Sequence, residues 1–272
     1  MSSDTGVNAV SQAGRVVVKV GTSTLTYENG RLNLRRIETL VRVLSDLKNS
    51  GKEIILVTSG AIGVGTGQLG LRQRPQDTAG KQAAAAVGQC ELMYSYDKQF
   101  SSYGHVTAQV LLTRDVIEDD RRKEHVVNTL SRLLEYGAIP IVNENDTVSV
   151  EEIEFGDNDT LSAIVAVLAR AQALVMLTDI DGLYTADPRR HADARLIPVV
   201  EAIDDTMRQA ASGAGSARGT GGMVTKLHAA EIATAAGIPT VIMSGADPRR
   251  LYDLFDGERI GTLFPGCRPN GR

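Results

Sequence analysis

Two short polar segments near the middle of the chain carry side chains that could hold a small polar substrate. Asn143-Glu144-Asn145-Asp146 follows an apolar run, and Gly156-Asp157-Asn158-Asp159 precedes another. Buried elements do not need so many carboxylates and carboxamides at their ends. We therefore interpret the two segments as parts of a binding site.

Two lysines in glycine-rich surroundings add a complementary chemistry. Lys19 lies in an apolar run and is followed by Gly21, and Lys226 follows a segment with three glycines, 219–222. Ammonium groups and free backbone N–H groups both bind phosphate oxygens. Alternatively, Lys19 extends to an exposed edge of the protein and Lys226 is a solvated lysine beside a flexible loop. Together with the acidic and amide segments, however, the lysines indicate a small-molecule kinase.

Three further segments carry weaker signals. Segment 58–63 follows an apolar run and opens a helix, so Ser59 is a candidate N-cap, and the helix N-terminus could also attract a carboxylate or phosphate. Segment 178–188 ends a strand and could contact ribose and base, although Asp-Gly and Asp-Pro are ordinary turn sequences. Segment 65–70 matches the spacing of a dinucleotide fingerprint but begins well after the strand ends, and we regard this match as a coincidence.

Composition excludes several classes of protein. The net charge of −4 argues against a general nucleic-acid-binding protein, and the two isolated cysteines suit a reducing cytosol. The polar start lacks the features of a signal peptide, and no apolar run approaches the roughly 18 residues of a membrane span. No histidine has a partner at metal-ligand spacing, so we expect no metal site built from protein ligands. We expect a cytoplasmic protein that binds neither nucleic acid nor membrane.

The candidate residues fall at the ends of alternating strands and helices. Hydrophobic periodicity predicts strands at 15–20, 53–57, 106–112, 138–142, 173–178 and 239–243. It predicts helices at 83–103, 121–136, 158–170 and 224–236, a helix between the first two strands, and a mobile loop at 210–222. This alternation predicts an α/β protein, a three-layer αβα sandwich around a mainly parallel sheet. Ligands of such sheets gather at the carboxyl ends of the strands, where the polar segments lie.

Seven segments in order resemble those of the glutamate 5-kinases, in the amino acid kinase superfamily. They are VKVGTS at 18–23, VTSGAIG at 57–63, VNEND at 142–146, FGDND at 155–159, LTD at 177–179, GLYTADP at 182–188 and GTGGMVTK at 219–226. The resemblance covers the chain from about residue 14 to 264. It implies the amino acid kinase fold and the transfer of a phosphoryl group from ATP to L-glutamate, the first step of proline synthesis.

The resemblance also implies roles for individual residues. Lys19, Lys226 and Asp159 are the expected catalytic residues, and Ser59, Asp146 and Asn158 are expected to bind glutamate. Residues expected to bind ATP are Lys19, Thr178, Asp179, Thr220, Gly221, Gly222, Met223, Val224, Thr225 and Lys226. Mg²⁺ would be carried mainly on the ATP phosphates. A single domain over 14–264 would then comprise a glutamate-binding lobe, about 14–170, and a nucleotide-binding lobe, about 171–264, with tails at 1–13 and 265–272.

Partners and regulation follow from the same resemblance. We expect a homo-oligomer, a dimer or tetramer, and the next enzyme of proline synthesis is a further expected partner. Many family members carry a C-terminal PUA module, for which we expect no counterpart here. Proline shares the α-amino and α-carboxylate groups of glutamate, so we expect it to inhibit by competing with glutamate. The charged stretch 118–123 is either a loop that closes over such a ligand or a solvated helix start.

Other functions remain possible on the sequence alone. A related kinase could act on N-acetylglutamate, aspartate, carbamate or a nucleoside monophosphate. A non-catalytic amino-acid sensor could keep the fold, although the presence of both lysines argues against it. A Rossmann dehydrogenase has only the match at 65–70 in its favour.

Overall fold

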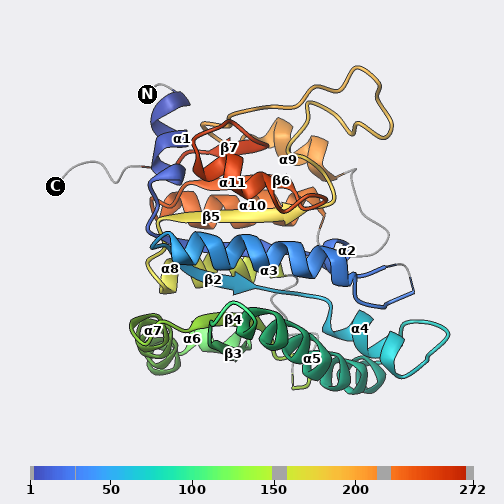
Figure 1. Cartoon of the computed structure of the whole chain (residues 1–272). Coiled ribbons are helices and arrows are strands. Elements are labelled where there is room, and N and C mark those ends of the chain that lie inside the picture. The colour runs from blue at the N-terminus through green and yellow to red at the C-terminus, as the bar shows by residue number, and fades with distance from the viewer. Residues whose placement is uncertain (1–2, 28, 149–157, 213–221, 268–272) are drawn as a thin grey trace.

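A seven-stranded sheet forms the centre of the structure (Figure 1), a computed structural model that describes residues 3–27, 29–148, 158–212 and 222–267. The strands are β1 Arg15–Val20, β2 Glu53–Val57, β3 Thr107–Leu112, β4 Ile139–Glu144, β5 Ala173–Thr178, β6 Thr240–Ser244 and β7 Thr262–Phe264. Their order across the sheet is β3-β4-β2-β1-β5-β6-β7. All neighbouring pairs from β3 to β6 are parallel, and β7 pairs antiparallel with β6.

Helices cover both faces of the sheet, which confirms the predicted three-layer architecture. They are α1 Ser3–Ser11, α2 Thr22–Leu25, α3 Leu34–Asn49, α4 Ala61–Gln68, α5 Thr78–Ser101, α6 Asp115–Glu118, α7 Asp120–Glu135, α8 Asn158–Leu168, α9 Asp205–Ser212, α10 Met223–Ala235 and α11 Arg250–Phe255. Helices α1 to α5 and α11 share one hydrophobic core with the sheet, and α6 to α10 pack on the other.

The alternation of side chains in β1 decides which layer Lys19 faces. Val16, Val18 and Val20 belong to the core beneath α3, whereas Val17 belongs to the core beneath α8 and α10. Since successive side chains of a strand point to opposite faces, Lys19 lies on the same face as Val17. The lysine is therefore directed toward α8 and α10.

The N-terminal residues form a docked helix where the sequence predicts a tail. Val7 and Val10 of α1 are buried in the core that also contains α11 and β7. The ammonium group of Lys52 donates hydrogen bonds to the carbonyl oxygens of Ser11 and Ala13, at 2.9 and 2.8 Å, and lies over the ring of Phe255. A cation at the end of a helix satisfies carbonyl groups that have no partner within the helix.

Helix boundaries differ from the predictions where capping residues decide them. Helix α5 begins at Thr78, five residues before the predicted start, because the side chain of Asp77 accepts a hydrogen bond from the backbone of Gly80. Helix α9 extends to Ser212 and so enters the predicted loop 210–222, most of which lies outside the described residues. Asp119 caps α7, as expected of a solvated helix start at 118–123.

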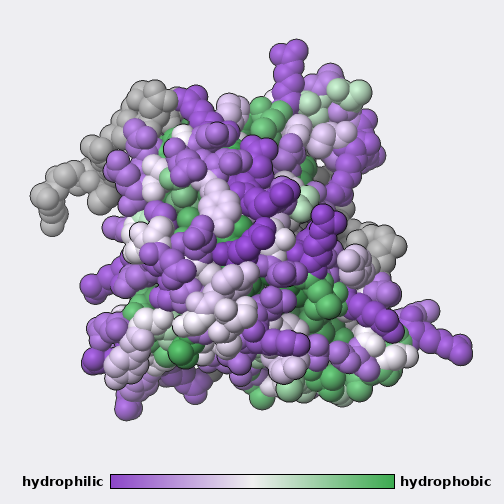
Figure 2. All heavy atoms as spheres, in the orientation of Figure 1, coloured by the Kyte–Doolittle hydropathy of each residue, from purple (hydrophilic) through white to green (hydrophobic). Residues whose placement is uncertain are grey.

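Helices α4 and α5 approach one another at backbone distance. A Cβ atom on Gly65 would lie 1.7 Å from the carbonyl oxygen of Ala84, and one on Gly88 would lie 1.8 Å from that of Ala61. This contact explains Gly65 in the segment that resembles a dinucleotide fingerprint. Figure 2 shows hydrophobic surface over α4 and α5. Leu69, directly after α4, and Val87, in α5, are exposed apolar residues.

Replacing Gly88 by alanine tests the close contact between α4 and α5. We expect Gly88→Ala to lower the free energy of unfolding by about 1–3 kcal/mol, because the added methyl group forces the two backbones apart. Chemical denaturation monitored by circular dichroism measures the change.

Gly63→Ala in α4 is the matched control, because its Cβ atom would meet only an ordinary contact, at 3.7 Å from a methyl group of Thr22. Alanine is the better helix former, so this control should be neutral or stabilising by up to about 1 kcal/mol. Equal losses in the two variants would show that the helix contact is not the cause.

Candidate active site

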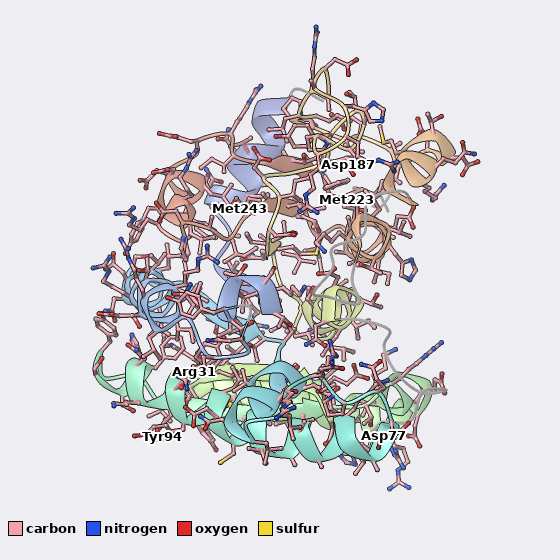
Figure 3. The ribbon with its side chains drawn as sticks, turned by 90° about the vertical axis from the view of Figure 1, so that its right-hand side faces the viewer. Arg31, Asp77, Tyr94, Asp187, Met223 and Met243 are labelled. Atoms are coloured by element: carbon pink, nitrogen blue, oxygen red, sulfur yellow. The ribbon has the colours of Figure 1, made fainter. Side chains whose placement is uncertain are left out.

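The carboxyl ends of the parallel strands bring the predicted site residues to one edge of the sheet. Lys19 lies near the end of the central strand β1, Thr58 and Ser59 follow β2, and Thr178 ends β5. Figure 3 looks onto this edge: Met223, at the start of α10, and Asp187, after β5, lie above, and Asp77, at the start of α5, lies below. The edge is therefore bordered by elements from both halves of the chain.

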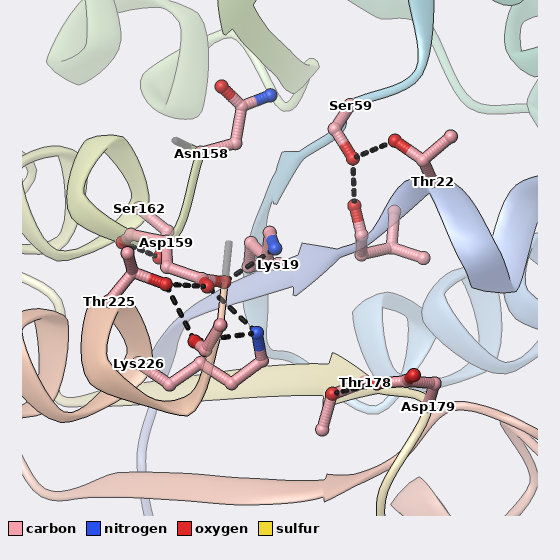
Figure 4. A network of polar contacts seen from close by, with 12 residues as sticks. Lys19, Thr22, Ser59, Asn158, Asp159, Ser162, Thr178, Asp179, Thr225 and Lys226 are labelled. Atoms are coloured by element: carbon pink, nitrogen blue, oxygen red, sulfur yellow. Dashed lines mark hydrogen bonds and ion pairs between the residues drawn. The ribbon is translucent and has the colours of Figure 1, made fainter. Parts of the chain in front are cut away.

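A buried carboxylate joins the two lysines. Asp159, in the first turn of α8, is fully buried and accepts hydrogen bonds from the ammonium groups of Lys19 at 2.5 Å and Lys226 at 3.0 Å (Figure 4). The hydroxyl group of Thr225 donates to the same carboxylate at 3.1 Å. The two lysines come from opposite ends of the sequence, and each is only 7% exposed. The structure thus brings together all three predicted catalytic residues.

The side chains of Lys19, Lys226 and Asp159 carry two positive charges and one negative charge. Two ammonium groups meet one carboxylate, so the three residues together carry one excess positive charge. Burial raises the pKa of the Asp159 carboxyl, but the charges and hydrogen bonds of Lys19 and Lys226 outweigh burial and lower this pKa to about 2. Asp159 is therefore ionised throughout the neutral range, and the cluster suits an anionic ligand.

Three helices that begin at this edge lack a side-chain cap. Their N-cap residues are the glycines Gly21 before α2, Gly60 before α4 and Gly222 before α10. By contrast, Asn33, Asp77 and Asp119 cap α3, α5 and α7 with their side chains. Gly21 lies close to Lys19, because a Cβ atom added to this glycine would lie 3.7 Å from the ammonium nitrogen, at ordinary contact distance. These uncapped N–H groups beside two lysines fit the phosphate groups of a nucleotide.

Asn158 lies beside Asp159 and belongs to a network of amides. Its Nδ2 atom donates to the carbonyl oxygen of Thr58 at 2.5 Å and to Oδ1 of Asn143 at 2.7 Å. Asn143 in turn donates through Nδ2 to Oε1 of Gln89 in α5, at 2.8 Å. Sequence patterns did not identify Gln89, because it lies in an alanine-rich helix without any local polar signal.

Ser59 binds the end of β1 and does not cap α4. Its hydroxyl group donates to the carbonyl oxygen of Val20 at 3.1 Å, and Thr22 donates to Ser59 at 3.3 Å. Gly60, with a φ of 96°, is the N-cap instead. Asp146 is half-buried in the turn that follows β4. Ser59 and Asn158 lie on one side of the lysines in Figure 4, and Thr178 and Asp179 lie on the other.

The end of β5 forms a second polar group. Thr178 is buried and donates to Asp179 at 3.1 Å, and Arg189 binds the other carboxylate oxygen at 3.0 Å. Burial raises the pKa of Asp179, but hydrogen bonds from Arg189 and Thr178 outweigh it and keep the pKa below its usual value.

The predicted loop at the start of α10 is described only in part. Gly222 precedes α10, in whose first turn Met223 is buried, Val224 is exposed and Thr225 binds Asp159. Thr220 and Gly221 lie outside the described residues.

The described residues contain neither a candidate membrane span nor a candidate metal cluster. None of the helices there combines the length and the hydropathy that a membrane span requires. The same residues contain no group of three His, Cys, Asp or Glu side chains arranged to hold a metal ion.

Comparisons with known proteins agree on one family. The model of the amino acid kinase family matches residues 14–244. A glutamate 5-kinase of Clostridium perfringens is 56% identical over 260 residues, which are 94% of this chain and 97% of the relative. One of Symbiobacterium thermophilum is 55% identical over 92% of this chain and 95% of the relative. One of Caldanaerobacter subterraneus is 54% identical over 92% of this chain but only 67% of the relative.

Solved structures with the same fold are more distant in sequence. An X-ray structure of isopentenyl phosphate kinase superimposes with a TM-score of 0.64 at 16% identity, covering 92% of this chain and 99% of the other. A complex of isopentenyl phosphate kinase with its substrate gives a TM-score of 0.65 at 18% identity, with the same coverage. At this identity the likeness shows a shared fold alone.

Replacing Asp159 tests the electrostatics of the site. Its pKa is lower in the folded protein than in the unfolded chain, so its contribution to stability is present above about pH 4 and is lost as the pH falls toward 2. We expect Asp159→Asn to destabilise the protein by about 3–5 kcal/mol at neutral pH, because it leaves two buried lysines without their carboxylate. This deficit should shrink by about 2 kcal/mol between pH 4 and pH 2.

Denaturant unfolding at a series of pH values measures the deficit. Asp256→Asn, at an exposed position, is the control and should follow the wild-type curve. A deficit that stays constant down to pH 2 would contradict the assigned charge interaction.

Proposed function

Because the chain belongs to the amino acid kinase family and, within it, to the glutamate 5-kinases, we propose that it transfers the γ-phosphoryl group of ATP to the side-chain carboxylate of L-glutamate. An oxygen of the carboxylate forms a bond to the γ-phosphorus, the bond from that phosphorus to the bridging oxygen of ADP breaks, and ADP leaves. The product, L-glutamyl 5-phosphate, is the first intermediate of proline synthesis. The observation that carries this proposal is the buried cluster of Lys19, Asp159 and Lys226.

Charge stabilisation is the main task of this cluster. The nucleophile is a carboxylate that is already ionised near neutral pH, so the reaction needs no general base. Negative charge on the transferring phosphoryl group must instead be neutralised and the reactants aligned. Lys19 and Lys226 supply the positive charge, and Asp159 holds both side chains in place. With a pKa of about 2, Asp159 orients the lysines without taking up a proton.

The nucleotide would bind on the β5 and α10 side of the lysines, in the lobe of about 171–264. Lys19, Thr178, Asp179 and the segment from Thr220 to Lys226 are the residues that we assign to it. The uncapped N–H groups at the start of α10 support this assignment, since they are available to phosphate oxygens. Mg²⁺ carried on the phosphates supplies further positive charge when bound.

Glutamate would bind on the β2 and β4 side, in the lobe of about 14–170. Asp146 and Asn158 offer acceptor oxygens for the α-ammonium group. Ser59 precedes the uncapped N-terminus of α4, which suits the α-carboxylate. This arrangement would point the side-chain carboxylate of glutamate toward the lysines. We place the reaction in the cytoplasm and propose that the next enzyme of proline synthesis consumes the reactive acyl phosphate.

A panel of acceptors with ATP and Mg²⁺ tests the function. Hydroxylamine traps an acyl phosphate as a hydroxamate, so product formation can be followed for each acceptor. We expect hydroxamate with L-glutamate, and much less with N-acetylglutamate or aspartate. Efficient turnover of another acceptor, with none of glutamate, would overturn the assigned substrate.

Removing either lysine should slow the chemical step. We expect Lys19→Met and Lys226→Met each to lower kcat by about 10²–10³-fold, which is typical for the loss of one charge-stabilising group. Steady-state kinetics with saturating glutamate and ATP measures the loss. Lys98→Met, on the exposed surface of α5, is the control and should keep wild-type kcat. Near-normal turnover in a folded lysine variant would remove that lysine from the mechanism.

Proline inhibition is the expected form of control. Proline carries the α-amino and α-carboxylate groups of glutamate but has no second carboxylate to accept a phosphoryl group. We expect it to compete with glutamate for Asp146, Asn158 and Ser59, within the kinase domain itself. Titrations of proline at several fixed glutamate concentrations should show inhibition that glutamate relieves. Inhibition that glutamate does not relieve would place proline at another site.

A further inference from the structure

Three amide side chains from three different elements form a hydrogen-bonded chain that ends at the proposed glutamate site. Gln89 comes from α5, Asn143 from the end of β4 and Asn158 from the start of α8. Oε1 of Gln89 accepts from Nδ2 of Asn143 at 2.8 Å, and Oδ1 of Asn143 accepts from Nδ2 of Asn158 at 2.7 Å. Gln89 and Asn143 are both more than nine-tenths buried. In both hydrogen bonds the NH₂ group of one amide donates to the carbonyl oxygen of the next.

Backbone groups determine the direction of this chain. The N–H group of Glu144 donates to Oδ1 of Asn143 at 2.9 Å, and an N–H group can only donate. The carbonyl oxygen of Thr58 accepts from Nδ2 of Asn158 at 2.5 Å, and a carbonyl group can only accept. If Asn143 turned by 180°, its NH₂ group would face both the N–H of Glu144 and the NH₂ of Asn158. The observed orientation avoids both clashes between donors.

Gln89, in α5, is the far end of this chain of amides and also supports the orientation of Asn143. It presents its carbonyl oxygen to Asn143 and thereby holds the NH₂ group of Asn143 away from Asn158. The Nε2 atom of Gln89 is buried and has no hydrogen-bond partner among the described residues. An unpartnered buried donor is unfavourable and calls for an explanation. In this orientation Gln89 presents its acceptor oxygen to Asn143 and leaves its own donor without a partner among the described residues.

This chain of hydrogen bonds fixes the orientation of the Asn158 side chain. Both hydrogen bonds that this side chain makes with other described residues are donated by Nδ2, and Oδ1 has no partner among these residues. An amide oxygen held in this orientation accepts hydrogen bonds from a cationic donor such as an α-ammonium group. A flipped Asn158 would present an NH₂ group there and would repel the same ligand.

We propose that Gln89 is a positioning residue for recognition of the substrate's α-ammonium group, acting through Asn143 on Asn158. The proposal rests on the proposed function, because it takes the α-ammonium group of glutamate as the ligand. Gln89 itself does not touch the substrate. Its effect should be confined to the part of binding that depends on the amino group.

Gln89→Leu tests the proposal, because leucine has a similar size but offers no acceptor to Asn143. We expect the KM for glutamate to rise about 10–100-fold, as for the loss of a hydrogen bond to a charged group, while kcat and the KM for ATP change less than about threefold. Gln89→Glu keeps an acceptor oxygen and should restore most of the affinity. Gln99→Leu, elsewhere on α5, is the control and should resemble the wild type.

Glutarate separates positioning from a general structural effect. It has both carboxylates of glutamate but lacks the amino group, so it cannot use Oδ1 of Asn158. We expect its inhibition constant to be unchanged within about twofold in Gln89→Leu, whereas glutamate binding weakens tenfold or more. Equal weakening of both ligands, or an unchanged KM for glutamate, would overturn the proposal. If Gln89→Leu does not fold, Gln89→Met makes the same test with the same expected result.

A double variant tests whether Gln89 acts through Asn158. In an Asn158→Ala background, Gln89→Leu should change the KM for glutamate less than about twofold, because the group that it positions is gone. Full additivity of the two changes would show that Gln89 does not act through Asn158. Hydroxamate formation by the wild type in the same assay tests the proposed function separately. If the wild type turns over glutamate but the two changes are additive, only the proposed action of Gln89 through Asn158 is overturned. If the wild type does not turn over glutamate, the proposed function and the ligand named here are both overturned.

Discussion

The buried carboxylate of Asp159 constrains both the fold and the site. A charge in a protein interior is unfavourable unless it is paired, and each of the three charged groups here depends on the others. The hydrogen bonds join residues that are 140 and 67 positions apart in the sequence. They connect the central strand β1 with α8 and α10, whose buried side chains share one hydrophobic core on the same face of the sheet. Any displacement of these elements would separate the charges, so the packing of this layer keeps the two lysines close together.

The order of the strands explains how two substrates could meet at this cluster. Strand β1 lies between β2 and β5, so Lys19 stands at the boundary between two halves of the sheet. The amide network extends from β2 and β4 on one side, and the polar group of Thr178 and Asp179 ends β5 on the other. Glycines begin the helices around the lysines and leave their first N–H groups uncapped. The fold thus adds backbone hydrogen-bond donors to the positive charge of the two lysine side chains.

Much of this arrangement could be predicted from the sequence, because aliphatic runs and helical spacing are local signals. They located six strands. Glycine-rich surroundings marked Lys19 and Lys226 as candidate site residues, and a polar segment marked Asp159. Helix α1 was missed because a short segment containing Gly6 has a weak pattern, and its burial depends on α11 and Lys52. Strand β7 is only three residues long and is defined by its pairing with β6. Gln89 has its partner 54 residues away, and no local pattern reveals an amide orientation. The roles assigned to the individual site residues remain predictions, and Thr220 and Gly221 lie outside the described residues.

The most direct test is a crystal structure with ADP, Mg²⁺, glutamate and an aluminium fluoride that mimics the transferring phosphoryl group. Our account predicts that the ammonium groups of Lys19 and Lys226 both lie within about 3 Å of the fluoride ligands, with Asp159 still bound to both lysines. The glutamate side chain should lie on the β2 and β4 side, with its carboxylate in line with the bridging oxygen of ADP. A phosphoryl mimic bound away from the two lysines would contradict the account.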